Sequence, residues 1–363
     1  MLQLTVAESR MNRVNEAQRE MTEESSPASH LSVAMTTTDM TQITSPNTVT
    51  SSSPRGIEFY FQIAVLMIGV VGTAENALIL YALVASKQHK THVLLVHQNA
   101  LDLFTSFFMI VTYTTMLFNI KLTGSVGYWL CMMILSECLP WWGTLASAIN
   151  LAAITVERYL KVVYPAWSKK KLHNWMIYLA MATAWIISFI NNIAVLFPTS
   201  DVIDGVCYTY MIFKNKTAKL FYFIWSFLSF YVVILFIFVF CYWRILLVIR
   251  RQARVMASHA ASGSSAGQNQ LNQIESNVVK TMILISACYA ILWSPTFVEF
   301  MILTLHPNPT PLDGVYYATV LWAYSYMCIN PFIYATKLDP VRKVLLRLIP
   351  CKKTTENATG NVA

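Results

Sequence analysis

Residues 153–165 read AITVERYLKVVYP, and this stretch decides how the rest of the chain is interpreted. A long apolar run begins near residue 130 and ends in the acid–base pair Glu157-Arg158. About 20 apolar residues are enough for a helix to cross a bilayer. An arginine at the end of such a helix can extend its charged group to the membrane surface. The stretch therefore predicts the end of a membrane span, with a charge pair at the boundary between lipid and water.

The composition of the whole chain favours a membrane protein. Of its 363 residues, 56% are hydrophobic and 12% are charged, whereas soluble domains carry about 25% charged residues. The net charge is +8, but the basic residues lie between apolar blocks, so we expect no nucleic-acid partner. The 7 cysteines are scattered and lack the spacing of zinc ligands. This pattern excludes a small disulfide scaffold and a zinc site.

Apolar segments of spanning length follow one another along the chain. The predicted spans are 57–84, 93–119, 130–160, 173–197, 220–249, 276–304 and 313–336. Residues 1–55 are polar and predict a disordered extracellular tail, and 56–337 form the membrane domain. Residues 338–363 predict an amphipathic helix and a short cytoplasmic tail. The small, polar segment 251–275 predicts a flexible loop.

The basic residues predict the orientation of these spans. Most of the 26 Lys and Arg residues fall on the inner side if the amino terminus lies outside. Because positive charge gathers on the cytoplasmic side, we expect a multi-pass protein of the plasma membrane with its carboxyl terminus in the cytoplasm. Arg158 then lies at the cytoplasmic end of the third span, and Lys169-Lys170-Lys171 faces the anionic leaflet of the lipid bilayer.

Short motifs occur in the predicted spans, in a fixed order. They are Glu75-Asn76, Asn99-Ala100-Leu101-Asp102, Glu157-Arg158-Tyr159, Trp185, Tyr242, Trp293-Ser294-Pro295 and Asn330-Pro331-Phe332-Ile333-Tyr334. With these motifs, residues 57–351 resemble the class A (rhodopsin-like) G-protein-coupled receptors. The resemblance implies an all-α membrane protein, a seven-transmembrane helix bundle with a short amphipathic eighth helix.

Asp102 lies in the middle of a span, where a carboxylate is costly unless it is hydrated or paired. The resemblance implies a pocket for a structural sodium ion and water, formed by Asn76, Asp102, Ser147 and Asn330. Tyr326 stands where the family often has a smaller polar residue, which leaves the sodium ion itself open. No other cofactor is expected.

Two prolines mark places where spans can bend. Pro295 and Pro331 each remove a backbone hydrogen bond and predict kinks. The resemblance implies that the sixth span swings outward about Pro295, with Trp293 beneath the ligand and Asn330-Pro331 as part of the switch. Tyr242 and Tyr334 would then support the open state.

Arg158 needs a partner at rest. Neighbours on a helix point in different directions, so a second acid besides Glu157 is expected. The resemblance implies Glu275, at the start of the sixth span, as the partner in an ionic lock. The surface for the G protein would then comprise Glu157, Arg158, Tyr159, Tyr242, Glu275 and Tyr334.

The resemblance also implies a disulfide between Cys131 and Cys207. Cys131 is two residues farther from Arg158 than the family spacing, which a small bulge or an earlier helix start would absorb. Asn215-Lys216-Thr217 is a glycosylation sequon. Cys351, after the amphipathic stretch, is a candidate for palmitoylation.

The outer third of the bundle offers acids and aromatic residues for a ligand. Pro140 replaces the aspartate by which the family's amine receptors bind a monoamine, and residues 313–336 lack the lysine that holds retinal. The candidate ligand residues are Glu137, Trp141, Trp142, Trp293, Glu299 and Tyr324. Acids and aromatics suit a basic ligand, and a peptide is favoured. The tryptophan pair is equally typical of the aromatic belt at a membrane interface.

Other classes of protein explain less of the sequence. The spans contain no nucleophile–base or metal-binding pattern, so an enzyme is not expected. A transporter or channel for a small solute is the alternative, but Asp102 is almost alone as an intramembrane charge. The prediction is a receptor that activates heterotrimeric G proteins, with arrestin and receptor kinases as further partners.

Overall fold

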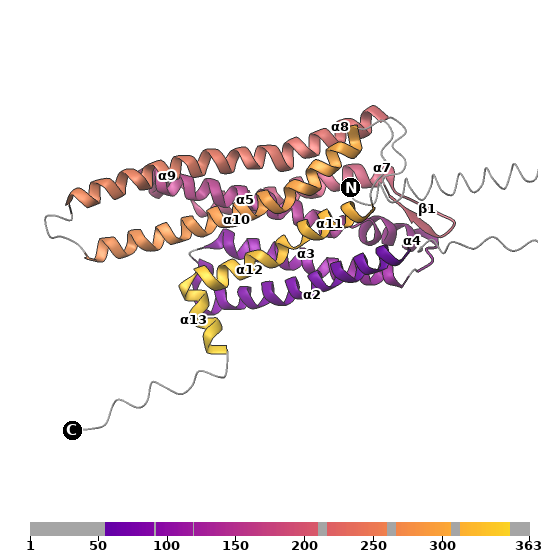
Figure 1. Ribbon diagram of the computed structural model, residues 1–363, viewed down its shortest axis with the longest axis horizontal. Coiled ribbons are helices and arrows are strands. Elements are labelled where there is room, and N and C mark those ends of the chain that lie inside the picture. Colours follow the sequence, from indigo (N-terminus) through magenta and orange to yellow (C-terminus); the bar gives the residue numbers. More distant parts are fainter. Residues whose placement is uncertain are drawn as a thin grey trace, which may run out of the picture.

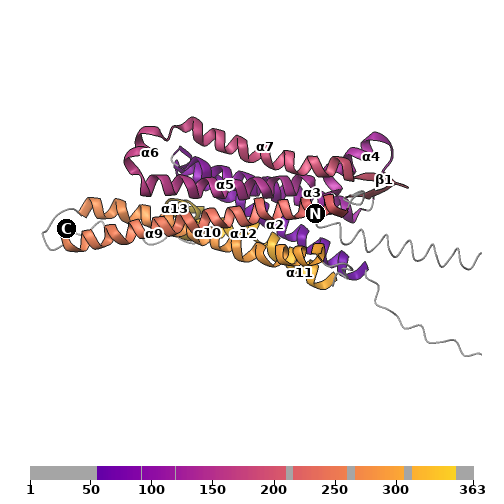
Figure 2. The ribbon, with the colours of Figure 1, turned by 90° about the horizontal axis from the view of Figure 1, so that it is seen from above.

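A computed structural model describes residues 55–90, 92–118, 120–209, 216–259, 266–305 and 313–348. Long helices run side by side in one elongated bundle (Figures 1 and 2). The elements are α2 Arg55–Ala85, η1 Gln88–Lys90, α3 Val93–Leu117, α4 Gly124–Leu130, η2 Cys131–Leu135, α5 Cys138–Val163, α6 Pro165–Lys171, α7 Asn174–Thr199, β1 Asp201–Ile203, β2 Val206–Tyr208, α8 Lys216–Phe227, η3 Leu228–Val232, α9 Val233–His259, α10 Ala266–Leu305, α11 Asp313–Tyr324, α12 Tyr326–Lys337 and α13 Asp339–Leu348. The predictions for residues 1–54, Asn215 and Cys351 fall outside the described residues.

The long helices close into a bundle around α3 and α5. Helix α2 packs against α3, α3 against α5, and α5 against both α7 and α9. Helix α12 closes the bundle through contacts with α2 and α10. Large apolar side chains on the outside are exposed, as on α9, where Phe236 is 69% and Val239 70% exposed. An apolar outer surface of this extent suits contact with lipid.

The described part of the chain has 6 helical stretches that are long and apolar enough to cross a membrane. They are Gly56–Ala85, Val93–Leu117, Gly124–Val163, Asn174–Thr199, Leu220–Gln252 and Val279–Ile302. The predicted seventh span is divided at Ser325 into α11 and α12, each of 12 residues. A helix of that length is only about 18 Å long, so neither piece spans a bilayer alone. In sequence the two follow each other, and the predicted seven-span bundle is confirmed.

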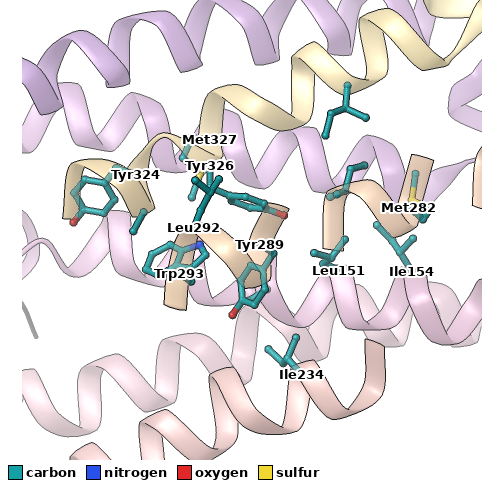
Figure 3. Packing of buried hydrophobic residues seen from close by; sticks show 14 of the residues in the cluster. Leu151, Ile154, Ile234, Met282, Tyr289, Leu292, Trp293, Tyr324, Tyr326 and Met327 are labelled. Atoms are coloured by element: carbon teal, nitrogen blue, oxygen red, sulfur yellow. The ribbon is translucent and has the colours of Figure 1, made fainter. Parts of the chain in front are cut away.

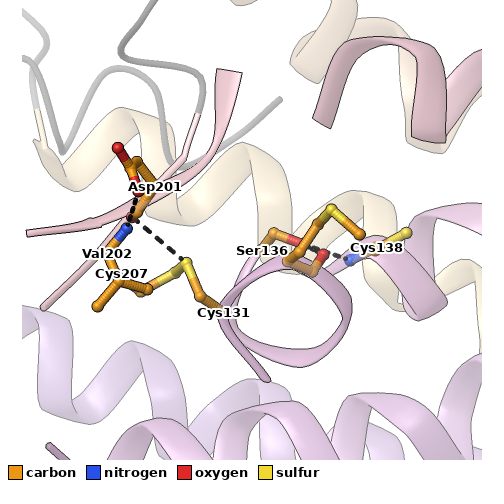
Figure 4. Close-up of a disulfide and its surroundings, with 7 residues drawn as sticks. Cys131, Ser136, Cys138, Asp201, Val202 and Cys207 are labelled. Carbon is orange, nitrogen blue, oxygen red and sulfur yellow. Dashed lines mark hydrogen bonds between the residues drawn. A yellow bond between two sulfur atoms is a disulfide. The ribbon is translucent and has the colours of Figure 1, made fainter. Parts of the chain in front are cut away.

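The third span is interrupted near the Cys131–Cys207 disulfide, at what we call the disulfide end of the bundle (Figure 4). Residues Cys131–Leu135 form a π-helical turn, and Glu137 has a left-handed backbone with φ of 60°. This irregular turn is the bulge that the spacing of Cys131 required, and the predicted disulfide is confirmed. Cys207 lies on β2, which pairs with β1 in an antiparallel hairpin.

The predicted flexible loop at 251–275 is wrong for most of its length. Helix α9 continues to His259, and α10 begins at Ala266. Arg, Gln, Ala and Met are good helix formers, and the segment contains no proline, so both helices extend beyond the apolar spans. Figure 1 shows them projecting past the other helices at the end of the bundle opposite the disulfide.

Pro331 does not interrupt α12, because another side chain satisfies the carbonyl group that it leaves free. A proline cannot donate to the carbonyl four residues earlier, here that of Met327. Asn76 Nδ2 of α2 donates to Met327 O at 3.1 Å. Helix α10 likewise continues through Pro295.

Aromatic and aliphatic side chains fill the centre of the bundle. In Figure 3, Trp293 and Tyr289 of α10 lie beside Tyr324 and Tyr326, at the junction of α11 and α12. All four side chains are at most 4% exposed. The core therefore places α10 directly against the divided seventh span.

Candidate functional site

At the disulfide end, a buried carboxylate joins three elements. Glu137, which precedes α5, is 4% exposed. Its Oε1 accepts a hydrogen bond from Tyr113 of α3 at 2.7 Å. Its Oε2 accepts one from Trp141 Nε1 of α5 at 3.1 Å and one from Tyr324 of α11 at 3.0 Å. The ion pairs in the described part of the chain do not include Glu137. Its negative charge is thus held by dipoles alone.

Aromatic rings connect this carboxylate to the core of the bundle. The Trp141 ring lies 5.9 Å from that of Trp293 and 6.3 Å from that of Tyr324, centroid to centroid. Trp293 Nε1 is buried without a partner among the described residues. A change at Glu137 therefore reaches α10 through one pair of stacked indoles.

The predicted ligand residues do not all lie together. Glu137, Trp141, Trp293 and Tyr324 form one cluster, which we call the Glu137 cluster. Trp142 lies elsewhere: its ring packs against Phe189 and Trp185, and its Nε1 donates to Trp185 O at 2.9 Å. Glu299 accepts a hydrogen bond from Thr319 between α10 and α11. Tyr113 belongs to the cluster and was missed, because its place depends on how α2, α3 and α11 pack.

In the middle of the bundle, Asp102 is surrounded by hydrogen-bond donors. Ser147 Oγ donates to Oδ1 at 2.8 Å, and Asn330 Nδ2 donates to Oδ2 at 2.9 Å. These are two of the partners that the resemblance implied. Asn76, the third, donates instead to Gly72 O and Met327 O.

A residue that the sequence analysis did not single out also contacts Asp102. Gln98, one turn earlier on α3, places Nε2 at 3.3 Å from Oδ1 and 3.5 Å from Oδ2. Asn150 Nδ2 donates to Gln98 Oε1 at 2.8 Å. The spacing of four residues from Asp102 was a signal that could have identified Gln98, because such pairs share a helix face.

At the end of the bundle opposite the disulfide, Arg158 has two partners. Its Nη2 lies 3.4 Å from Glu157 Oε2 and 3.1 Å from His92 Nδ1. Lys161 Nζ lies 2.6 Å from the other oxygen of Glu157. The expectation that Glu157 points away from Arg158 is wrong, since the long arginine side chain reaches back to it. The predicted partner Glu275 lies on α10, but its side chain is outside the described residues.

His92 acts as an acceptor toward Arg158. A guanidinium group only donates hydrogen bonds, so the Nδ1 atom of His92 carries no proton. Burial lowers the pKa of His92 from its usual 6.5 to about 4, and the charge of Arg158 lowers it further in the same direction. His92 is therefore neutral at physiological pH.

The other predicted switch residues occupy separate places in the bundle. Tyr242 OH lies 3.0 Å from both Thr155 Oγ1 and Ser286 Oγ, and so joins α9 to α5 and α10. Tyr334 is fully buried, and its hydroxyl finds no partner in the described part of the chain. The ring of Tyr159 packs against Tyr164 and Phe240.

Comparisons with known proteins agree with this architecture. Residues 75–334 match the family model described as 7 transmembrane receptor (rhodopsin family). The chain is 26% identical over 290 residues to sphingosine 1-phosphate receptor 1 of Danio rerio, covering 76% of this chain and 74% of the relative. It is 23% identical over 317 residues to somatostatin receptor type 5 of Rattus norvegicus, covering 83% and 81%. The crystal structure of squid rhodopsin is similar in fold, with a TM-score of 0.67, 17% identity and 83% of each chain covered.

Proposed function

The chain belongs to the rhodopsin family of seven-transmembrane receptors, and we propose that it binds an extracellular ligand and activates heterotrimeric G proteins. It is a multi-pass membrane receptor and not an enzyme, and the family displaces the alternative of a transporter or channel. In the proposed orientation, the disulfide end faces outward and Arg158 faces the cytoplasm. The charge distribution of the loops supports this orientation.

The proposed ligand carries a positive charge, and a peptide with a basic group is the favoured class. The observation that carries this proposal is the Glu137 carboxylate, buried at the disulfide end with three donors and no cationic partner among the described residues. A buried charge is costly unless it is paired. A ligand cation would supply the missing charge, and the surrounding rings would stabilise it further. The relatives are named for chemically different ligands, so their names do not decide the class.

The proposed signal passes from Glu137 through Trp141 to Trp293 on α10. A ligand changes the balance between two conformations only through its different affinity for each. In this proposal, contact at Trp141 and Trp293 favours the conformation in which α10 swings outward about Pro295. The opening beside Arg158 then admits the G protein, and arrestin and receptor kinases would use the same side.

The test is a G-protein reporter assay with panels of basic peptides and amines. Cells express the full chain or the variant Glu137→Gln, matched for surface level. We expect a cationic agonist to lose about tenfold or more in potency on Glu137→Gln, because a hydrogen bond to a charged group contributes about 1.5–3 kcal/mol. Asp204→Asn, on the exposed turn of the β1–β2 hairpin, is the control and should leave potency unchanged. Equal potency on the wild type and Glu137→Gln would reject Glu137 as the ligand's counter-ion.

A further inference from the structure

The three polar side chains that contact Asp102 all donate to it. They are Ser147, Asn330 and Gln98. The Gln98 nitrogen is nearly equidistant from the two carboxylate oxygens, at 3.3 Å and 3.5 Å. This is the bridging position that a bound cation would take. The Gln98 side chain is itself fully buried.

A chain of hydrogen bonds from the neighbouring helices fixes the orientation of Gln98. It starts at Trp185 of α7, whose indole N–H donates to His97 Nε2 at 2.9 Å. An indole nitrogen can only donate, so His97 Nε2 carries no proton and the proton of the neutral ring lies on Nδ1. That nitrogen donates to Asn150 Oδ1 at 2.9 Å.

The direction of each following amide is then determined. Because the oxygen of Asn150 accepts from His97, its nitrogen must face Gln98, and it donates to Gln98 Oε1 at 2.8 Å. The same nitrogen donates to Leu94 O at 3.1 Å. With its oxygen occupied, Gln98 presents its NH₂ group to Asp102 and Ser147. The amide orientation follows from the donor-only indole, and it cannot be reversed without breaking the chain.

The residues around Asp102 do not fit the sodium ion that the fold family implies. A hard cation needs several oxygen ligands, but Gln98 and Asn330 direct N–H groups toward the carboxylate. The hydroxyl of Ser147 donates to Asp102 and accepts from Gln98, so its oxygen is already engaged. Asn76 directs its amide to backbone carbonyls and not to Asp102.

We infer that the Gln98 carboxamide takes the place of a cation at Asp102, so that this receptor's central pocket is satisfied internally and excludes Na⁺. Gln98 is then the residue that determines ion specificity at Asp102. Its consequence is a receptor whose resting conformation does not depend on sodium. The relay that orients Gln98 also connects α7, α3, α5 and α12 through one continuous set of hydrogen bonds.

The test measures melting of the purified full chain in NaCl and in choline chloride of equal ionic strength. We expect the wild type to melt at the same temperature in both salts. Gln98→Leu keeps a similar volume and removes the donor and acceptor, so we expect a Na⁺-specific rise in its melting temperature that saturates with NaCl. The double variant Gln98→Leu/Asp102→Asn should lose that rise.

Either of two results would overturn the inference. One is a saturable, Na⁺-specific stabilisation of the wild type that Asp102→Asn abolishes. The other is a folded Gln98→Leu variant whose melting temperature is the same in both salts, since the amide would then not be what excludes the ion. The wild-type measurement decides the first point even if the variants fail to fold.

Discussion

Glu137 combines a charged side chain with a backbone conformation that non-glycine residues rarely adopt. Its φ of 60° lies in the left-handed region, which costs roughly 1–2 kcal/mol for an L-residue. The three hydrogen bonds to its carboxylate offset that cost and hold the group between α3, α5 and α11. Backbone strain at a buried charge is typical of binding sites. The site is therefore formed before any ligand arrives.

Removing one donor from Glu137 tests whether these bonds stabilise the receptor. Tyr113→Phe deletes the hydroxyl that donates to Oε1 at 2.7 Å. We expect a loss of about 1–3 kcal/mol in stability, because a buried carboxylate would lose a donor. The measurement is thermal melting of the purified chain, with Tyr60→Phe as control, since Tyr60 is 72% exposed. Identical melting of Tyr113→Phe and wild type would show that the bond contributes nothing.

His92 is the residue whose replacement should raise signalling without a ligand. His92→Leu removes the acceptor that holds Arg158, a contact worth about 1 kcal/mol or more. We expect a several-fold rise in ligand-free reporter activity at matched surface expression. His92→Gln keeps an acceptor and should stay near wild type.

The control for this prediction is His173→Leu, at an exposed position outside the Arg158 contacts. Basal activity that is unchanged in His92→Leu would remove His92 from the resting lock. It would leave the predicted Arg158–Glu275 pair as the candidate for that role.

Several of these contacts could not have been read from the sequence. Trp141 and Trp142 are adjacent, and neighbours on a helix point about 100° apart, so only one of them could join Glu137. The partners His92 and Arg158 are 66 residues apart, and only the packing of α3 against α5 brings them together. Asp102, Ser147 and Asn330 could be predicted, because a buried carboxylate needs donors and each lies in the motif pattern.

At the scale of elements, Asn76 compensates for the backbone bond that Pro331 removes from α12. Asn76→Leu would leave the carbonyl of Met327 buried without a donor, and we expect it to cost about 1–3 kcal/mol. Pro331→Ala restores the missing N–H, so Asn76→Leu should cost less in that background. A double-mutant cycle of melting temperatures measures the difference. Strictly additive effects would contradict the compensation.

The spans themselves were predictable, because runs of apolar residues reflect the thickness of the bilayer. The ends of α9 and α10 were not, since small polar residues suggest a loop although nothing in them prevents a helix. The break before α5 was foreshadowed only by the spacing of Cys131. Its position at Glu137 depends on contacts with α3 and α11 that lie far away in sequence.

At the scale of the whole molecule, the proposed orientation makes a prediction about glycosylation. With the disulfide end outside, the sequon at Asn215 is exposed to the glycosylation machinery and that at Asn357 is not. We expect glycosidase treatment to shift the wild type and Asn357→Gln on a gel, but not Asn215→Gln. A glycan that is lost only in Asn357→Gln would reverse the orientation.

The account joins two distant ends of one bundle. A cationic ligand at Glu137 acts through Trp141 and Trp293 on α10, and movement of α10 opens the surface around Arg158. Tyr242, which bonds to α5 and α10, lies between these ends and would lose a partner as α10 moves. The central claim is that this surface activates a G protein.

The most direct test of that claim is nucleotide exchange on purified heterotrimeric G proteins of each Gα class, with the receptor reconstituted in nanodiscs. The account predicts that the wild type accelerates exchange over empty nanodiscs with at least one class. It also predicts that His92→Leu does so more strongly without a ligand and that Arg158→Gln does not. Exchange at the rate of empty nanodiscs for both wild type and His92→Leu, with every class, would contradict it.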